Sequence, residues 1–344
     1  MNKAFVATAV VGMMTAAAAY FTPARAAGDL TLYCSAQIEW CQEMAVAFER
    51  ETGIKVAMTR KSSGETYAQI KAESANPRGD VWWAGTGDPH LQAAEEDLTV
   101  EYTSPRLGEL LDWSKAQAAT SGNKTVGIYA GALGFGYNTE VLAQRGLPEP
   151  KCWADLTKAD YRGEIQMANP NSSGTAYTML ATMVQLMGED KAFDYLRELH
   201  PNISEYTKSG SAPIKSAANG EATIGIVFMH DAVTQAASGF PIKVVAPCEG
   251  TGYEIGSMSI IKGARNMESA KTWYDWALSP EAQALAINAK AYQVPSNASA
   301  PVPAESPKLS DIKLIDYDFK KYGSSDERGR LLAKWDSEVN ALSN

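Results

Sequence analysis

The chain has 344 residues, 45% hydrophobic and 21% charged, which is enough apolar material for one large core or two smaller ones. At this length we expect two lobes. The formal net charge of −9 argues against nucleic acids and anionic membrane surfaces as partners, and an anionic ligand would need a local positive site.

The first 26 residues have the pattern of a secretory signal peptide. Lys3 supplies a short positive region, residues 4–21 are an apolar stretch, and "ARA" at 24–26 is a small-x-small cleavage site. We therefore expect cleavage before Ala27 and a periplasmic protein. An uncleaved anchor helix is the alternative, and no later segment is long and apolar enough to span a bilayer.

The next segment, residues 29–85, alternates between strand and helix patterns. The order βαβαβ predicts a parallel sheet with helices on both faces, in which ligands bind at the carboxyl ends of the strands. Ser35, Ser62 and Thr86 lie in the loops at those ends. The elements expected are a strand at 29–34, a helix at 39–53, a strand at 54–60, a helix at 62–74 and a buried strand at 79–85.

Four cysteines in an exported chain make disulfides the expected state. We favour Cys34–Cys41 with Cys152–Cys248, because Cys34 and Cys41 are close in sequence and flank a predicted loop. A metal site is the competing interpretation. No CxxC occurs, and no histidine has ligand spacing from a cysteine, so we expect neither a metal nor another cofactor.

A glycine-rich β run at 125–142 is predicted to pass from one lobe into another, and a second β crossing is predicted at 241–264. The fold class expected is therefore α/β, two-lobed, with two β crossings as the hinge. We assign the parts as follows: 27–128 plus 254–300 form lobe 1, 129–253 form lobe 2, and 301–344 form a C-terminal helical segment.

The word Ser-Ser-Gly occurs twice, each time at the start of a predicted helix and at equivalent places in the two lobes. A helix N-terminus has unpaired N–H groups and about half a positive charge, which suits an anion. The alternative is that the serines only cap their own helices, for about 1 kcal/mol each. The candidate residues are Ser62, Ser63 and Gly64 in the first word, and Ser172, Ser173, Gly174 and the following Thr175 in the second.

These features, with "FERETGIKV" at 48–56 and "WALSPEAQAL" at 276–285, resemble substrate-binding proteins of bacterial ABC importers, in the structural class of the periplasmic ferric-ion-binding proteins. The resemblance covers essentially the whole mature chain. It implies a type II Venus-flytrap fold in which a ligand binds between the lobes, the lobes close, and the closed form is passed to an inner-membrane ABC permease.

Ferric-binding members of this class have two adjacent tyrosines after a strand of the second lobe, whereas this chain has Met229, His230 and Asp231 there. The chain is more similar to the hexose-phosphate-binding branch, with Ser62, His230, Asp231 and Glu254 at matching positions. The resemblance implies that the serines hold a phosphate while Asp231 and Glu254 accept hydrogen bonds from sugar hydroxyls. His230 would donate to the ligand.

We therefore expect a monomeric binding protein for a small phosphorylated solute, with hexose 6-phosphate favoured. Ferric ion and 2-aminoethylphosphonate remain alternative ligands, and His230 and Asp231 also fit a core histidine and a helix cap. A periplasmic phosphatase is the alternative from another class. The chain lacks the GxSxG, GxxxxGK[ST] and HExxH motifs, so we expect no enzyme.

Overall fold

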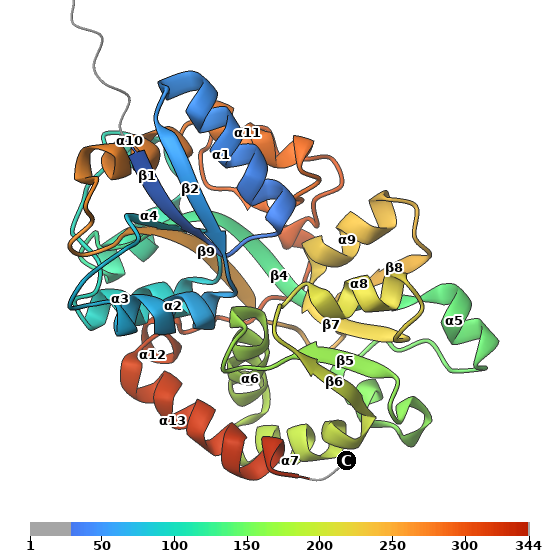
Figure 1. Cartoon of the computed structure of the whole chain (residues 1–344). Coiled ribbons are helices and arrows are strands. Elements are labelled where there is room, and N and C mark those ends of the chain that lie inside the picture. Colours follow the sequence, from blue (N-terminus) through green and yellow to red (C-terminus); the bar gives the residue numbers. More distant parts are fainter. Residues whose placement is uncertain (1–28, 343–344) are drawn as a thin grey trace, which may run out of the picture.

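The computed structural model describes residues 29–342 and shows a mixed α/β molecule with two lobes (Figure 1). The predicted signal peptide lies outside the described residues. No helix within 29–342 has the length and apolar composition needed to cross a bilayer. Neighbouring strands are hydrogen-bonded in the spatial order β2-β1-β3-β9-β4-β7-β5-β6, and β8 and β10 also pair with β4.

The first lobe begins with the predicted βαβαβ unit. Strand β1 (Asp29–Cys34) pairs in parallel with both β2 (Lys55–Arg60) and β3 (Val81–Trp83). Cys34 is level with Arg60 on one side and with Trp83 on the other. The loops that follow these three strands therefore leave the sheet side by side. The helices of this lobe are α1 (Ile38–Thr52), α2 (Ser63–Ala72), α3 (Gly87–Glu95), α4 (Asp112–Thr120), α10 (Met267–Ala277) and α11 (Pro280–Asn288).

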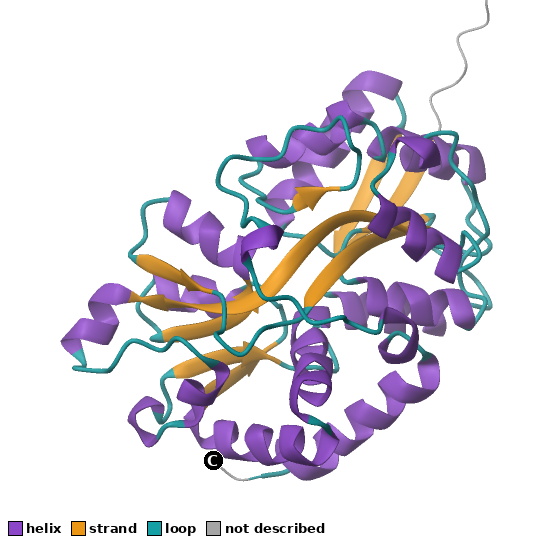
Figure 2. Ribbon diagram, turned by 180° about the vertical axis from the view of Figure 1, so that it is seen from behind, coloured by secondary structure: helices purple, strands orange, loops and turns teal. Residues whose placement is uncertain are grey.

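Two long strands connect the lobes, as the sequence predicted (Figure 2). All thirteen residues of β4 (Val126–Asn138) are buried. Its first half pairs with β9 (Tyr253–Ile260) and β10 (Val294–Pro295), and its second half pairs with β7 (Ile224–Phe228) and β8 (Ile242–Val245). A single strand thus belongs to the sheets of both lobes.

The second lobe repeats the α/β plan. Its remaining strands are β5 (Ile165–Ala168) and β6 (Ile203–Thr207), which are parallel. Its helices are α5 (Thr139–Gln144), α6 (Gly174–Met187), α7 (Glu189–Leu199), α8 (Ala212–Ala218) and α9 (Met229–Ala237). Each lobe has its own large cluster of buried apolar side chains, which is what two independently packed sheets require.

One predicted element differs from the structure. The sequence at the start of residues 152–170 predicts a helix, but the structure has two short 3-10 turns there, Trp153–Thr157 and Ala159–Tyr161. The Glu249 carboxylate accepts hydrogen bonds from the N–H groups of Trp153 and Ala154 at 2.8 and 2.9 Å, so side chains satisfy this backbone without a regular helix.

The structure contains the disulfides Cys34–Cys41 and Cys152–Cys248, which is the favoured pairing. The first closes a short loop that connects β1 to α1. The second joins segments 96 residues apart in the second lobe.

The C-terminal segment lies mainly on the second lobe (Figure 1). It contains α12 (Phe319–Tyr322) and α13 (Ser325–Trp335), and Leu331 and Trp335 are part of the second lobe's core. Its other end contacts the first lobe, where the Ser325 N–H donates to Glu95 of α3 at 2.6 Å. The segment therefore touches both lobes.

Candidate functional site

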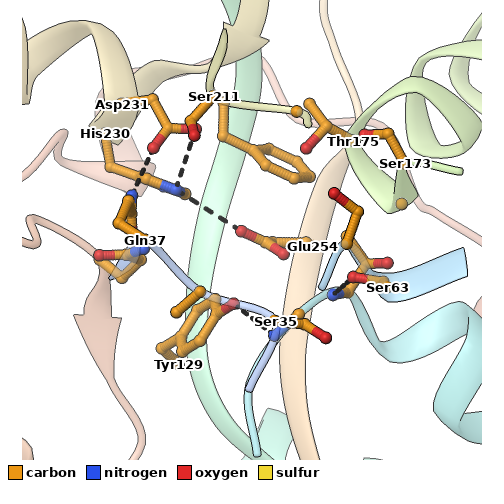
Figure 3. Close-up of a pocket in the computed structure, with 18 of the residues that line it drawn as sticks. Ser35, Gln37, Ser63, Tyr129, Ser173, Thr175, Ser211, His230, Asp231 and Glu254 are labelled. Carbon is orange, nitrogen blue, oxygen red and sulfur yellow. Dashed lines mark hydrogen bonds and ion pairs between the residues drawn. The ribbon is translucent and has the colours of Figure 1, made fainter. Parts of the chain in front are cut away.

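A cavity lies between the lobes at the carboxyl ends of the strands (Figure 3). Its volume is about 50 Å³, room for about four water molecules at the ~10–15 Å³ that each requires. Ten of the twelve predicted ligand-binding residues line it: Ser35, Ser62, Ser63, Thr86, Ser173, Gly174, Thr175, His230, Asp231 and Glu254. Gly64 and Ser172 are the two that do not.

Six helices begin at the wall of this cavity. Their N-cap residues, all of which line it, are Gln37 (α1), Ser62 (α2), Thr86 (α3), Ser173 (α6), Ser211 (α8) and Phe228 (α9). Three of these helices belong to each lobe. Because each helix N-terminus carries partial positive charge and N–H groups that lack acceptors in their own helix, their convergence makes the cavity favourable for an anion.

The serines of the first lobe have different hydrogen-bonding states. The Ser63 hydroxyl accepts from the N–H of Thr86 at 3.2 Å, which leaves its own proton available to a ligand. Ser62 starts α2, and the Glu65 carboxylate accepts from the Ser62 N–H at 3.3 Å. The Ser62 hydroxyl is buried at the N-cap of α2, in a capping box with Glu65, and makes no hydrogen bond of normal geometry within the described chain.

The two serines of the second Ser-Ser-Gly motif make different hydrogen bonds. Ser173 caps α6 by accepting from the N–H of Ala176 at 3.4 Å, and its hydroxyl faces the cavity. Ser172 points away, since its hydroxyl donates to backbone carbonyls of Asn169 and Lys208 at 3.2 and 3.1 Å.

The opposite wall is formed by His230, Asp231 and Glu254 (Figure 3). The Nε2 atom of His230 lies 3.7 Å from a Glu254 carboxyl oxygen and 3.9 Å from one of Asp231. The imidazole stacks on Phe228, and Gln37 of the first lobe donates a hydrogen bond to Asp231. Asp231 and Glu254, carried on different elements, therefore face one imidazole.

Burial controls the protonation of these groups. Burial raises the pKa of Asp231 to about 6 and lowers the pKa of His230 to about 3. Burial, with the negative charges of Asp231 and Asp88 nearby, also raises the pKa of Glu254 well above its ordinary value. At neutral pH the histidine of the closed cavity is therefore neutral, and Glu254 holds its proton more tightly than an exposed glutamate.

Several cavity residues were not among the predicted ligand-binding residues. Arg60 is the only lysine or arginine among the described residues that line the cavity, and burial lowers its pKa. It donates to the Ala36 carbonyl at 2.9 Å and, across the lobes, to Ser209 at 3.2 Å. Arg60 lies two residues before Ser62, and this position in the sequence could have identified it as a cavity residue. The others include Gln37, Tyr129, Ser211 and Gln293.

Buried polar atoms without partners also indicate a binding site for a polar solute. Oxygen atoms of Gln37, Ser62, Thr86 and Gln293 line the cavity, are inaccessible to solvent, and have no hydrogen-bond partner within the described chain. Because buried polar groups are rarely left unpaired, a polar solute with many donors and acceptors fits this cavity better than an apolar one.

Two α/β lobes around a polar cavity define the class of two-lobed solute-binding proteins. The chain belongs to the family described as bacterial extracellular solute-binding protein, whose model matches residues 87–321. An uncharacterized protein of Haemophilus influenzae is 48% identical over 332 residues, which is 95% of either chain.

Solved structures agree on the fold. The periplasmic binding protein AfuA from Actinobacillus pleuropneumoniae, with exogenous fructose-6-phosphate bound, is 48% identical with a TM-score of 0.90, over 92% of this chain and 99% of AfuA. Iron-bound HitA from Pseudomonas aeruginosa is 19% identical with a TM-score of 0.74, over 89% of this chain and 99% of HitA. The second similarity shows a shared fold with the ferric-binding class and nothing about the ligand.

Proposed function

We propose that the chain is the periplasmic solute-binding component of an ABC importer and that it captures a sugar phosphate, with hexose 6-phosphate favoured. The observation that carries this proposal is the convergence of six helix N-termini on a cavity that also contains two buried carboxyl groups. The first feature suits a phosphate and the second suits sugar hydroxyls. The fructose-6-phosphate bound to AfuA supports the same ligand class.

In this proposal the phosphate binds near the starts of α2 and α6. Ser62, Ser63, Ser173 and Thr175 supply hydroxyl donors there, and Arg60 supplies the positive charge. Hydrogen bonds to a charged group contribute about 1.5–3 kcal/mol each, so these donors would supply most of the affinity.

The sugar would be recognised by hydrogen bonds with Asp231, Glu254 and His230. The raised pKa of Glu254 favours its protonated form, in which the carboxyl group donates one hydrogen bond, accepts others and adds no negative charge beside a phosphate. The neutral His230 adds one further polar contact. Selectivity for the ester over free phosphate would come from this wall.

The two alternative ligands fit less well. Tyr129 is the only tyrosine among the described cavity residues, and burial raises its pKa well above the ordinary value, which disfavours the phenolate that ferric ion prefers. A phosphonate with an ammonium group would need ionised carboxylates, whereas burial shifts Glu254 towards its protonated form.

The test is thermal unfolding of the purified chain with glucose 6-phosphate or fructose 6-phosphate, beside glucose plus inorganic phosphate at equal concentration. A ligand at about 1,000 times its Kd stabilises the folded state by about 4 kcal/mol. We expect a shift with the esters only. A shift with ferric ion or 2-aminoethylphosphonate but not with the esters would overturn the proposal, and release of inorganic phosphate from the ester would indicate a phosphatase.

After binding, the solute would be transferred to the permease. Since lobe closure encloses the cavity, we propose that the closed, loaded form is what the inner-membrane permease recognises. Because the cavity lies between the lobes, they must separate to admit a hexose phosphate and close again around it.

A further inference from the structure

The two Ser-Ser-Gly words meet each other across the lobes. The N–H of Gly64, the second residue of α2, donates to the carbonyl of Ser172 at 3.0 Å. The first N–H groups of any α-helix lack acceptors within their own helix. The second lobe therefore provides an acceptor that α2 itself does not provide.

Gly64 leaves no room for a side chain at this contact. A Cβ atom on Gly64 would lie 2.4 Å from the carbonyl oxygen of Asn171 and 2.9 Å from that of Ser172. Both obstacles are backbone atoms of the opposite lobe, so no rotamer change would relieve the overlap. Within α2, by contrast, alanine is the better helix former.

Gly174 makes the reciprocal contact. A Cβ atom there would lie 1.8 Å from the Thr86 hydroxyl oxygen and 2.8 Å from the Thr86 methyl carbon. Thr86 is the N-cap of α3 in the first lobe. Each word thus places its glycine against the other lobe, while the serines Ser62, Ser63 and Ser173 face the cavity.

We propose that Gly64 and Gly174, with Ser172 and Thr86, form an interlobe latch that determines how completely the lobes close over the ligand. Resting on the proposed function, the latch makes Gly64 a positioning residue: it controls affinity through closure while lying outside the cavity wall. Apparent affinity falls in proportion to the population that can close, so blocking the contact weakens binding without removing a ligand contact.

The variant Gly64→Ala tests this directly, and Gly329→Ala is its matched control. Gly329 lies within α13, and a Cβ atom added to it would meet no atom of the described residues within 4 Å, so alanine there changes helix propensity alone. For Gly64→Ala we expect glucose 6-phosphate to bind at least about tenfold more weakly by calorimetry, the scale of overpacking a tight contact. The ligand-free melting temperature should not fall, and X-ray scattering should show less ligand-induced compaction. Gly64→Ala with the wild-type Kd would overturn the latch.

A second measurement separates the latch from the choice of ligand. With [15N]glycine labelling, the rate of hydrogen exchange at the Gly64 amide is compared among the wild type, Gly174→Ala and Gly329→Ala. The comparison is made without ligand. We expect faster exchange only in Gly174→Ala. Equal exchange in all three chains would overturn the latch. If glucose 6-phosphate binds to none of them, the proposed function fails, and the exchange rates still decide the latch.

Discussion

Hydroxyl groups in this site differ in whether the protein already uses them. The Ser62 hydroxyl is buried in the cavity wall without a partner among residues 29–342, whereas the Ser172 hydroxyl is hydrogen-bonded to two carbonyls outside the cavity. The first is free to serve a ligand, and the second holds its own loop in place.

The substitutions Ser62→Ala and Ser172→Ala should therefore have opposite effects. Ser62→Ala is expected to weaken glucose 6-phosphate binding by about tenfold or more, because a hydrogen bond to a charged group is lost, with little change in the free energy of unfolding. Ser172→Ala should cost about 1 kcal/mol of stability and little affinity. Calorimetry and urea unfolding measure the two quantities. Equal losses of affinity would reduce Ser62 to a helix cap.

Asp231 gives the ligand-free protein a pH-dependent stability. Its pKa is raised from 3.8 to about 6 on folding, so the folded state binds the proton more tightly than the unfolded state. The stabilisation is fully present below pH ~4 and is lost as the pH rises through 6. Relative to Asp231→Asn, the wild type should lose about 3 kcal/mol of unfolding free energy between pH 4 and 7. Urea unfolding at both pH values checks this, and parallel behaviour of the two chains would contradict it.

Single site residues were predictable where they follow a strand. Ser35, Ser62 and Thr86 come after three parallel strands whose ends lie level, so the βαβαβ pattern was sufficient to bring them together. No sequence pattern marks Gln293 as a cavity residue. It lies in the loop just before β10, far along the chain from the strands that position the other site residues. Tyr129 lies in a fully buried strand, where every side chain is inside and no alternation marks one as special.

At the scale of elements, one disulfide supports the cavity and the other supports the stability of the second lobe. Cys34–Cys41 encloses the loop that carries Ser35 and Gln37 to the cavity. Cys152–Cys248 involves no cavity residue and joins segments 96 residues apart. The first positions the site, and the second restricts the unfolded chain.

Replacing each pair by serine should separate these roles. Cys152→Ser with Cys248→Ser is expected to cost about 4 kcal/mol of unfolding free energy, because it releases a long loop, and to leave the Kd for glucose 6-phosphate nearly unchanged. Cys34→Ser with Cys41→Ser should cost less stability and more affinity. Denaturant unfolding and calorimetry on both chains test this, and the reverse ranking would disprove it.

The elements themselves were predictable where periodicity was strong. The strands and helices of residues 29–85 and the two β crossings were expected from apolar patterns and glycine boundaries. The region after Cys152 was not, because the carboxylates that hold its 3-10 turns include Glu249, far away in the sequence. Side-chain contacts between distant segments leave no periodic pattern.

In the whole molecule, the C-terminal segment ties the lobes together away from the cavity. Arg328 of α13 is 2% exposed and lies 4.0 Å above the ring of Tyr177 in the second lobe. Its charge lowers the pKa of Asp88 in the first lobe against a larger increase from burial, with a net pKa of about 6. A buried charge in each lobe is thus coupled to the other.

Removing one of these two buried charges should cost more than removing both. Arg328→Met is expected to destabilise the protein by about 2 kcal/mol, the Coulomb energy of charges several ångströms apart, because the buried Asp88 loses a nearby positive charge. Adding Asp88→Asn should recover part of that loss. A double-mutant cycle by urea unfolding gives the coupling, and additive effects would show that the two charges act independently.

The position of β9 between β3 and β4 has a consequence for how the polypeptide is made. Ribosomes deliver β3 and β4 long before Tyr253, the first residue of β9. Until then both strands have an edge of unpaired N–H and C=O groups, which is a template for pairing with other chains. Such long-range pairing also slows folding. The first lobe is therefore completed only after most of the second has been synthesised, and a fragment that stops before Tyr253 should aggregate instead of folding as a half-sized binding module.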